Sequence, residues 1–152
     1  MIIISPYSRA LRNGKRNPKN FPYWKEVLQN LKQYDIIQIG TTGEDKLVGD
    51  FRKGLPYNEI KNLIKQCDVW MSVDNFLPHL AHHVGKPGVV VWGISDPIVF
   101  GYPENINVLK DRSYLRKNQF DMWDNYPFDP NVFPSVDEVV KSIQSLIRTN
   151  NK

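Results

Sequence analysis

Short apolar runs alternate along the chain with segments whose apolar residues recur at helical spacing. The apolar runs are rich in β-branched and aromatic residues and predict strands at residues 1–5, 35–39, 47–51, 69–73, 88–92 and 106–109. The helically spaced segments predict helices at residues 21–34, 56–66, 79–84 and about 136–148, the last capped by Ser135. Because strands alternate with helices, we expect an α/β fold: a single Rossmann-like domain over residues 1–152, with a parallel sheet and helices on both faces.

The composition is that of an ordinary globular chain, with 41% hydrophobic and 24% charged residues among 152. No apolar run approaches the roughly 20 residues that span a bilayer, so no membrane span is expected. Residues 1–5 are too short for a signal peptide. The single cysteine, Cys67, cannot form an internal disulfide and precedes a strand, where inert packing is expected. These features favour a cytoplasmic location.

Positive charge is concentrated in the first part of the chain. Residues 1–65 carry 12 Lys or Arg and 6 Asp or Glu, a net of +6, whereas residues 66–152 carry 8 and 10, a net of −2. Five cations lie in the aperiodic loop at residues 6–20, here called the basic loop: Arg9, Arg12, Lys15, Arg16 and Lys19. Such clustering favours a phosphate-bearing ligand over a merely solvated loop. Nucleic acid is a weaker expectation, because it would need more basic faces and exposed stacking aromatics.

Residues 67–97 are the most informative stretch: a strand, a polar turn, a short helix, a tight turn and a second strand. In open α/β sheets, ligands bind at the carboxyl ends of the strands. Asp74 stands at such an end, and His79 lies in the first turn of the helix, where the helix dipole also favours an anion. We therefore expect the ligand site here, with His79 as a phosphate donor.

Three further patterns bear on the chemistry of the chain. The turn Gly40-Thr41-Thr42-Gly43-Glu44 resembles a phosphate-cradling turn, but it lacks both the dinucleotide fingerprint and the P-loop pattern. Glu44 would either accept hydrogen bonds from ribose hydroxyls or cap a helix. His79 and His83 are one helical turn apart without a third ligand at a known spacing, so we expect no metal site. No serine has the Gly-x-Ser-x-Gly setting of a hydrolase nucleophile.

Residues 74–97 resemble the signature of the heptosyltransferases, glycosyltransferase family 9. That signature reads Asp-Ser/Thr-Gly-x-x-His-Leu-Ala, then Lys-Pro or Arg-Pro, then a strand that ends Phe-Gly-x-Thr/Ser-Asp-Pro. Here it appears as DNFLPHLA at residues 74–81, GKP at 85–87 and WGISDP at 92–97. Upstream, KNFP at residues 19–22 is similar to the family's Lys-x-Trp-Pro, and residues 40–44 to its glycine turn ending in Glu. The resemblance runs in register over about residues 2–103.

The resemblance implies the C-terminal, donor-binding half of a GT-B glycosyltransferase. It also implies an ADP-type nucleotide or nucleotide-sugar ligand, with no cofactor required. By position, Ser8 and Lys19 would meet the phosphates, Glu44 the ribose, Leu55 the base and Asp74 the sugar. The pyrophosphate would be held by His79 and by the backbone of Asn75, Phe76 and Leu77. Arg9 and Thr41 complete the expected substrate-binding residues.

The chain departs from the family pattern at three points. Phe76 stands where the family has a glycine that lets phosphate approach the backbone. The family's helix after the glycine turn is missing or reduced to residues 45–46. No segment matches the acceptor-binding domain that carries the catalytic base, for which Asp74 and Asp96 are substitutes by position alone.

We therefore expect a glycosyltransferase-like, nucleotide-sugar-binding domain whose catalysis requires a partner to supply the acceptor side. That partner would be a second protein chain or another copy in a homo-oligomer, and the catalytic residues stay unassigned. A non-catalytic nucleotide-binding, sequestering or regulatory protein is the alternative, and a nucleic-acid-binding module is a weaker one. The sequence leaves open whether the aromatic passage at residues 114–134 packs on the domain or forms an interface.

Overall fold

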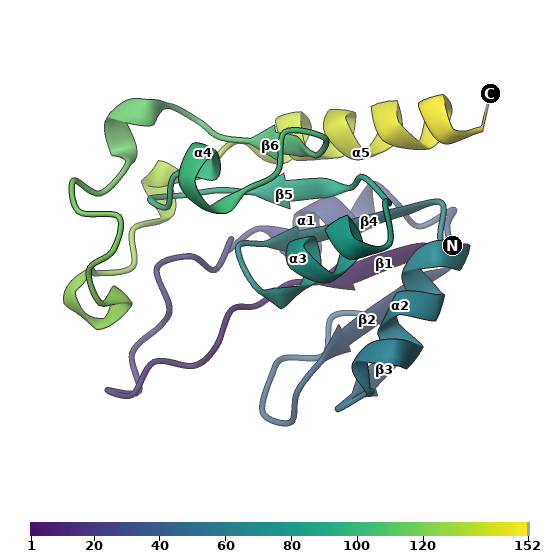
Figure 1. The fold of residues 1–152 in the computed structure, drawn as a ribbon, viewed down its shortest axis with the longest axis horizontal. Helices are drawn as coiled ribbons and strands as arrows, with labels where there is room; N and C mark the ends of the chain where they lie inside the picture. Colours follow the sequence, from purple (N-terminus) through teal and green to yellow (C-terminus); the bar gives the residue numbers. More distant parts are fainter. Residues whose placement is uncertain (152) are drawn as a thin grey trace.

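Six parallel strands form one sheet in the computed structural model, which describes residues 1–151 (Figure 1). The strands are β1 (Ile2–Ser5), β2 (Ile36–Gly40), β3 (Asp50–Lys53), β4 (Val69–Val73), β5 (Val89–Val91) and β6 (Ile106–Val108). Their order is β3-β2-β1-β4-β5-β6, and every neighbouring pair is parallel. The predicted α/β fold with a parallel sheet is confirmed. Strands β1, β4 and β5 are buried along their whole length, which explains their continuous apolar runs.

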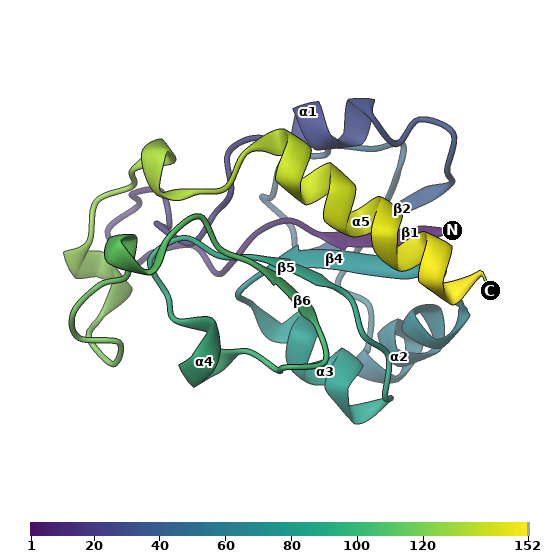
Figure 2. The ribbon, with the colours of Figure 1, turned by 90° about the horizontal axis from the view of Figure 1, so that it is seen from above.

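Helices cover both faces of this sheet, as Figure 2 shows. One face is covered by α1 (Trp24–Gln29) and α5 (Val136–Asn150). The other is covered by α2 (Tyr57–Gln66), α3 (Phe76–His83) and the short α4 (Pro97–Phe100). The Ser135 hydroxyl accepts from the Glu138 amide and caps α5, as predicted. None of the helices in residues 1–151 is long and apolar enough to cross a bilayer.

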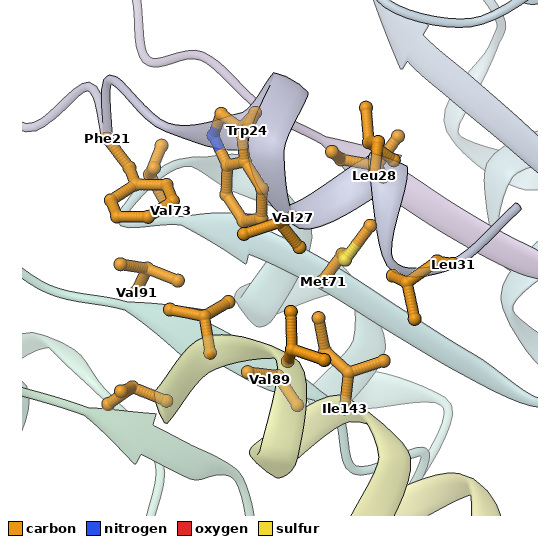
Figure 3. Close-up of a cluster of buried hydrophobic side chains, with 14 of the residues drawn as sticks. Phe21, Trp24, Val27, Leu28, Leu31, Met71, Val73, Val89, Val91 and Ile143 are labelled. Atoms are coloured by element: carbon orange, nitrogen blue, oxygen red, sulfur yellow. The ribbon is translucent and has the colours of Figure 1, made fainter. Parts of the chain in front are cut away.

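The core is divided by the sheet into two clusters. On the α1 and α5 face, Met71, Val73, Val89 and Val91 pack against Trp24, Val27 and Ile143 (Figure 3). On the other face, Trp70 and Trp92 are fully buried, and their indole N–H groups donate to the Lys86 carbonyl and to Asn107 Oδ1, both at 2.9 Å. The tryptophans are therefore core residues whose polar atoms are satisfied.

Cys67 belongs to the second cluster and is buried. Burial raises the pKa of its thiol to about 11. The thiol therefore stays protonated at neutral pH, in agreement with the predicted inert packing.

Several element boundaries differ from the predicted ones. The helix predicted at residues 21–34 is reduced to α1, because the Asn30 side chain donates to the Glu26 carbonyl (2.9 Å) and the Leu31 amide bonds three residues back. The strand predicted at residues 47–51 begins three residues later and ends two residues later, as β3. The reason is that only residues 50–53 pair with β2.

Side-chain caps account for the other two differences. Helix α3 begins at Phe76 rather than at His79, because Asn75 Oδ1 accepts from the Leu77 amide (3.0 Å). Helix α4 was not predicted, and it starts where Asp96 Oδ1 accepts from the Ile98 amide (2.9 Å). Both caps lie in the stretch that carries the family resemblance.

Residues 114–134 fold back over the carboxyl edge of the sheet, at the same end as the basic loop (Figure 1). The passage includes two short 3-10 turns, η2 (Trp123–Asn125) and η3 (Pro130–Val132), and follows a third, η1 (Arg112–Tyr114). The Arg16 guanidinium lies 4.0 Å from the centroid of the Phe128 ring, and Lys19 Nζ lies 4.9 Å from that of Trp123. The passage therefore packs on the domain and fixes the basic loop by cation–π contacts.

Candidate functional site

The strand order reverses between β1 and β4, and we call the junction of the loops that follow these two strands the crevice. Reversal points of this kind are where open α/β sheets bind ligands. Ser8 and Lys19 come from the basic loop after β1, and Asp74 and Asn75 come directly after β4. The fold therefore brings the two most informative parts of the sequence together.

Hydrogen bonds fasten the two sides of the crevice to each other. The Ser8 hydroxyl donates to the Asp74 carbonyl, and Asn75 Nδ2 donates to Ser5 Oγ (3.0 Å) and to the Tyr7 carbonyl (3.1 Å). Because the Leu77 amide is already bonded to the Asn75 side chain, it is not free for a phosphate. The expected backbone contribution to phosphate binding is therefore reduced at Leu77. The predicted phosphate contact of Ser8 is likewise not supported, because its hydroxyl proton is used by the Asp74 carbonyl.

Lys19 and Asp74 form an ion pair within the crevice, with 3.6 Å between Nζ and Oδ2. Their side chains are only 16% and 12% exposed. Burial lowers the pKa of Lys19, and Asp74 opposes this effect. Arg116 and Arg9 lie close enough to lower the pKa of Lys19 further by like-charge repulsion. Two further cations thus lie near the Lys19–Asp74 pair, which leaves an excess of positive charge for an anionic ligand.

Arg116 is a site residue that the sequence reasoning missed. It is 7% exposed, and its guanidinium lies 3.3 Å from the centroid of the Trp123 ring. It donates to the Gln119 and Asp121 carbonyls, while its Nε is buried without a partner among the described residues. Burial lowers the pKa of Arg116. The guanidinium holds residues 116–126 in shape beside the ion pair.

Glu44 lies against Gly40 in the turn after β2. A Cβ added at residue 40 would lie 1.9 Å from Glu44 Oε2, so only glycine leaves room for this carboxylate. The Thr41 hydroxyl donates to Glu44 Oε1 (3.2 Å), and burial raises the pKa of Glu44. The Tyr7 phenol lies near this turn. Burial raises the pKa of the phenol, and the charges of Asp45 and Glu44 raise it further. The carboxylate is therefore held beside the start of the basic loop, in a turn and not at a helix end.

Phe76 stacks on Tyr57, with ring centroids 5.9 Å apart and planes inclined by 21°. The stack joins the first residues of α2 and α3, and Tyr57 is 64% exposed. Leu55 packs on the same apolar cluster as Phe76. The side chain that replaces the family's glycine is thus directed toward α2, where it forms an aromatic surface with Tyr57.

The three histidines of α3 are exposed, and two of them contact the segment that follows α4. His79 Nδ1 bonds to the Tyr102 hydroxyl (2.7 Å), and His82 pairs with Glu104. No contact among the described residues joins His79 to Lys19 or Asp74, so its role as a phosphate donor stays a prediction. No three His, Cys, Asp or Glu side chains of residues 1–151 gather as metal ligands would.

Asp96 serves the fold in two ways. It caps α4, and both of its carboxylate oxygens accept from the Arg112 guanidinium, at 3.1 and 2.8 Å. This bidentate pair lowers the pKa of Asp96. Its carboxylate is therefore engaged by other groups, which disfavours it as the substitute base.

Two surface cavities lie elsewhere, and only the first includes cations of the basic loop. One, of about 360 Å³, lies between Lys15, Arg16 and residues 124–128. The other, of about 530 Å³, lies between α1 and the connection from β2 to β3. Neither cavity therefore coincides with the junction of the loops after β1 and β4, where the predicted site residues meet.

Comparison with known proteins finds solved structures that share this fold. No protein-family model matches the chain, and no curated protein matches its sequence. Among solved structures, the ADP-heptose lipopolysaccharide heptosyltransferase II of E. coli matches 99% of this chain with a TM-score of 0.71, at 14% identity. The fold is that of the family 9 glycosyltransferases.

Two further structures agree with this fold. A glycosyltransferase family 9 protein from Veillonella parvula matches 98% of the chain with a TM-score of 0.69, at 14% identity. TibC of enterotoxigenic E. coli, described as an iron-containing dodecameric glycosyltransferase, matches 99% with a TM-score of 0.63, at 18% identity. The chain covers 47%, 46% and 46% of these three structures, so it spans about half of their length.

Proposed function

We propose that the chain binds an ADP-type nucleotide or nucleotide sugar in the crevice between β1 and β4, in the service of glycosyl transfer. The observation that carries this proposal is the buried Lys19–Asp74 ion pair at the reversal of the strand order, with Arg9 and Arg116 close to Lys19. A diphosphate carries the negative charge that such a group of cations stabilises. The E. coli enzyme that shares the fold is an ADP-heptose heptosyltransferase by description, which favours an ADP-type donor.

The crevice offers a partner for each part of such a donor. In our proposal, Lys19 and the amide of Phe76 meet the phosphates, and Thr41 and Glu44 meet the ribose. The base lies on Leu55 and the stacked rings of Tyr57 and Phe76, since aromatic faces favour stacking with a flat ring. Phe76 then extends the base surface and need not block the phosphates, because its ring is directed toward α2.

The chemistry of transfer follows from the charges. As the bond between sugar and diphosphate breaks, negative charge develops on the departing diphosphate. Lys19 stabilises that charge and is supported by Arg9 and Arg116. In our proposal the transfer uses these side chains and no cofactor. Asp74 is positioned beside Lys19 to accept hydrogen bonds from the sugar.

The acceptor side remains to be supplied. Transfer needs a base to activate the acceptor hydroxyl. Asp74 is paired with Lys19, and Asp96 is held by Arg112. We therefore propose that the base and the acceptor are contributed by residues other than these, such as those of a second protein chain or of another copy of this one.

Calorimetric titration with ADP, UDP, GDP and an ADP-sugar tests the proposal. We expect the ADP compounds to bind and Lys19→Met to weaken them roughly tenfold or more, because the variant removes a charge-assisted contact. Lys65→Met, on the exposed last turn of α2, is the matched control and should leave binding unchanged. The absence of binding to every nucleotide, or equal binding by the Lys19 variant, would contradict it.

A further inference from the structure

The cavity of about 530 Å³ between α1 and the connection from β2 to β3 has no part in the function proposed above. Its lining includes Asp35 and Ile36, where β2 begins, so it lies at the amino end of that strand. The candidate site residues follow the carboxyl ends of the strands, at the opposite end of the sheet. We call it the amino-end cavity. Its volume falls within the range of about 300–1,000 Å³ that small-molecule sites occupy.

The topology of the chain explains why this place is open. The connections from β1 to β2 and from β2 to β3 each move the chain by one strand in the same direction. Because crossovers between parallel strands are right-handed, both connections run over the same face of the sheet. The first connection contains α1, whereas residues 41–49 of the second contain no helix. The amino-end cavity therefore occupies the place beside α1 where a crossover helix usually packs.

The inner lining of the amino-end cavity is mainly aliphatic. Five of its residues belong to the core cluster on this face or pack against it: Leu28, Tyr34, Ile36, Leu47 and Val48. Leu28 is buried, and the other four are partly exposed. Only one of the five is aromatic. The lining therefore favours an aliphatic chain over a flat ring, which would need aromatic faces for stacking.

Three lysines surround this apolar lining: Lys25 and Lys32 on the side of α1, and Lys46 on the side of the connection. All three are exposed, and no ion pair of residues 1–151 involves them. Asp35 is the only acidic side chain in the lining, so three positive charges face one negative charge. Lysine stems cover apolar surface while their ammonium groups stay in water. The positive charge therefore lies at the mouth of the cavity, above the aliphatic lining.

We propose that the amino-end cavity binds a medium-chain fatty carboxylate, with its chain on the aliphatic lining and its carboxylate among the three lysines. The chain favours binding because each methylene that enters the cavity leaves water. The carboxylate accepts charge-assisted hydrogen bonds from the ammonium groups, which fix the orientation of the ligand. Binding here requires no nucleotide, because the cavity and the crevice lie at opposite ends of the sheet.

Titration with octanoate and decanoate, followed through the chemical shifts of the backbone amides, tests the proposal. We expect saturable changes at residues 28–36 and 46–49. Decanoate should bind roughly fivefold or more tightly than octanoate, because it has two more methylenes to bury. Octan-1-ol, which lacks the charge, and acetate, which lacks the chain, should each bind roughly tenfold or more weakly than octanoate.

Lysine substitutions separate the amino-end cavity from other surfaces. Lys32→Met with Lys46→Met keeps two unbranched side chains and removes two charges, so it should weaken decanoate binding roughly tenfold or more. Lys65→Met, on the exposed last turn of α2 and on the other face of the sheet, is the matched control and should leave decanoate binding unchanged.

Three results would overturn the proposal. The first is the absence of saturable changes at these amides up to about 1 mM decanoate. The second is equal binding of octan-1-ol and octanoate, which would remove the role of the lysines. The third is equal binding of decanoate by the double variant and the wild type. Titration of the same samples with ADP reports on the crevice separately, so failure of this site and failure of nucleotide binding give different results.

Discussion

Glu44 and Gly40 illustrate how single residues position the candidate site. The absence of a Cβ at residue 40 lets the Glu44 carboxylate lie directly over the backbone. The same burial disfavours the ionised form and raises the pKa of Glu44. The carboxylate is thus held in a position that costs stability at neutral pH, as is common for binding residues.

We predict that Glu44→Gln raises the melting temperature and weakens ADP binding. Because the folded-state pKa of Glu44 lies above its unfolded value, protonation of Glu44 stabilises the fold at low pH, and this stabilisation is lost as pH rises through the folded-state pKa. At pH 7 the neutral Gln therefore removes a cost, with a rise of up to about 2 °C in Tm, measurable by calorimetry. ADP affinity falls because an acceptor for the ribose hydroxyls is lost.

The pH dependence gives an internal check on this prediction. As the pH is lowered, wild-type affinity for ADP should begin to fall while the pH is still above 4.5, the ordinary pKa of Glu. The affinity of Glu44→Gln should lack this pH-dependent fall. Glu59→Gln, in the exposed first turn of α2, is the control and should change neither quantity. A lower Tm for Glu44→Gln, or unchanged ADP affinity, would count against the assigned role.

At the residue scale, the sequence could predict contacts that follow from strand ends. Lys19 and Asp74 meet because parallel strands bring their carboxyl ends to one edge. Arg116 could not be predicted, because it reaches the ion pair only through the tertiary packing of an aperiodic passage. The stacking of Phe76 on Tyr57 likewise depends on the packing of α2 beside α3.

At the element scale, the connection from β2 to β3 crosses the sheet without a helix. The buried Gln38 side chain fixes this connection by two hydrogen bonds. Its Nε2 donates to the Asp45 carbonyl (2.8 Å), and its Oε1 accepts from the Leu47 amide (2.7 Å). Leu47 and Val48 then pack on the core beneath α1. Their apolar character predicted a strand at residues 47–51, whereas it serves packing in an extended connection.

The elements that could be predicted are those with two covered faces. Strands β1, β4 and β5 read as continuous apolar runs because helices bury them from both sides. Element boundaries were harder to predict, since polar side chains that cap helices set them, as Asn75 and Asp96 do. Periodicity alone does not show whether such a side chain caps a helix or points to solvent.

The turn between α3 and β5 offers a test of packing between elements. A Cβ at Gly88 would lie 2.1 Å from the buried Trp70 ring, whereas a Cβ at Gly85 would meet open space but a φ of +71°. We predict that Gly88→Ala lowers the free energy of unfolding by about 3 kcal/mol through overpacking. Gly85→Ala should cost about 1 kcal/mol through backbone strain.

Urea unfolding of the two glycine variants measures both costs under the same conditions. The comparison is matched, because both changes add one methyl group within a few residues of each other. Equal losses, or a larger loss for Gly85→Ala, would mean that Trp70 has room to move and that the second core cluster is loosely packed.

At the scale of the whole molecule, helices cover both faces of the sheet, and the candidate site residues lie at one edge. The basic loop, the turn after β2 and residues 114–134 all gather at the carboxyl edge. The chain spans about half the length of the solved structures that share its fold. The α/β fold could be predicted from the alternation of strands and helices. The packing of residues 114–134 over the carboxyl edge of the sheet could not, because that passage has no periodicity.

The measurement that tests the central claim most directly is a map of ADP-induced chemical-shift changes in the backbone amides. The account predicts the largest changes at Ser8, Lys19, Glu44 and Phe76, around the crevice between β1 and β4. Amides on α5 should stay unchanged, because that helix lies on one face of the sheet, away from the carboxyl edge. Changes confined to the cavity at Lys15, Arg16 and residues 124–128, or no change up to about 1 mM ADP, would contradict the account.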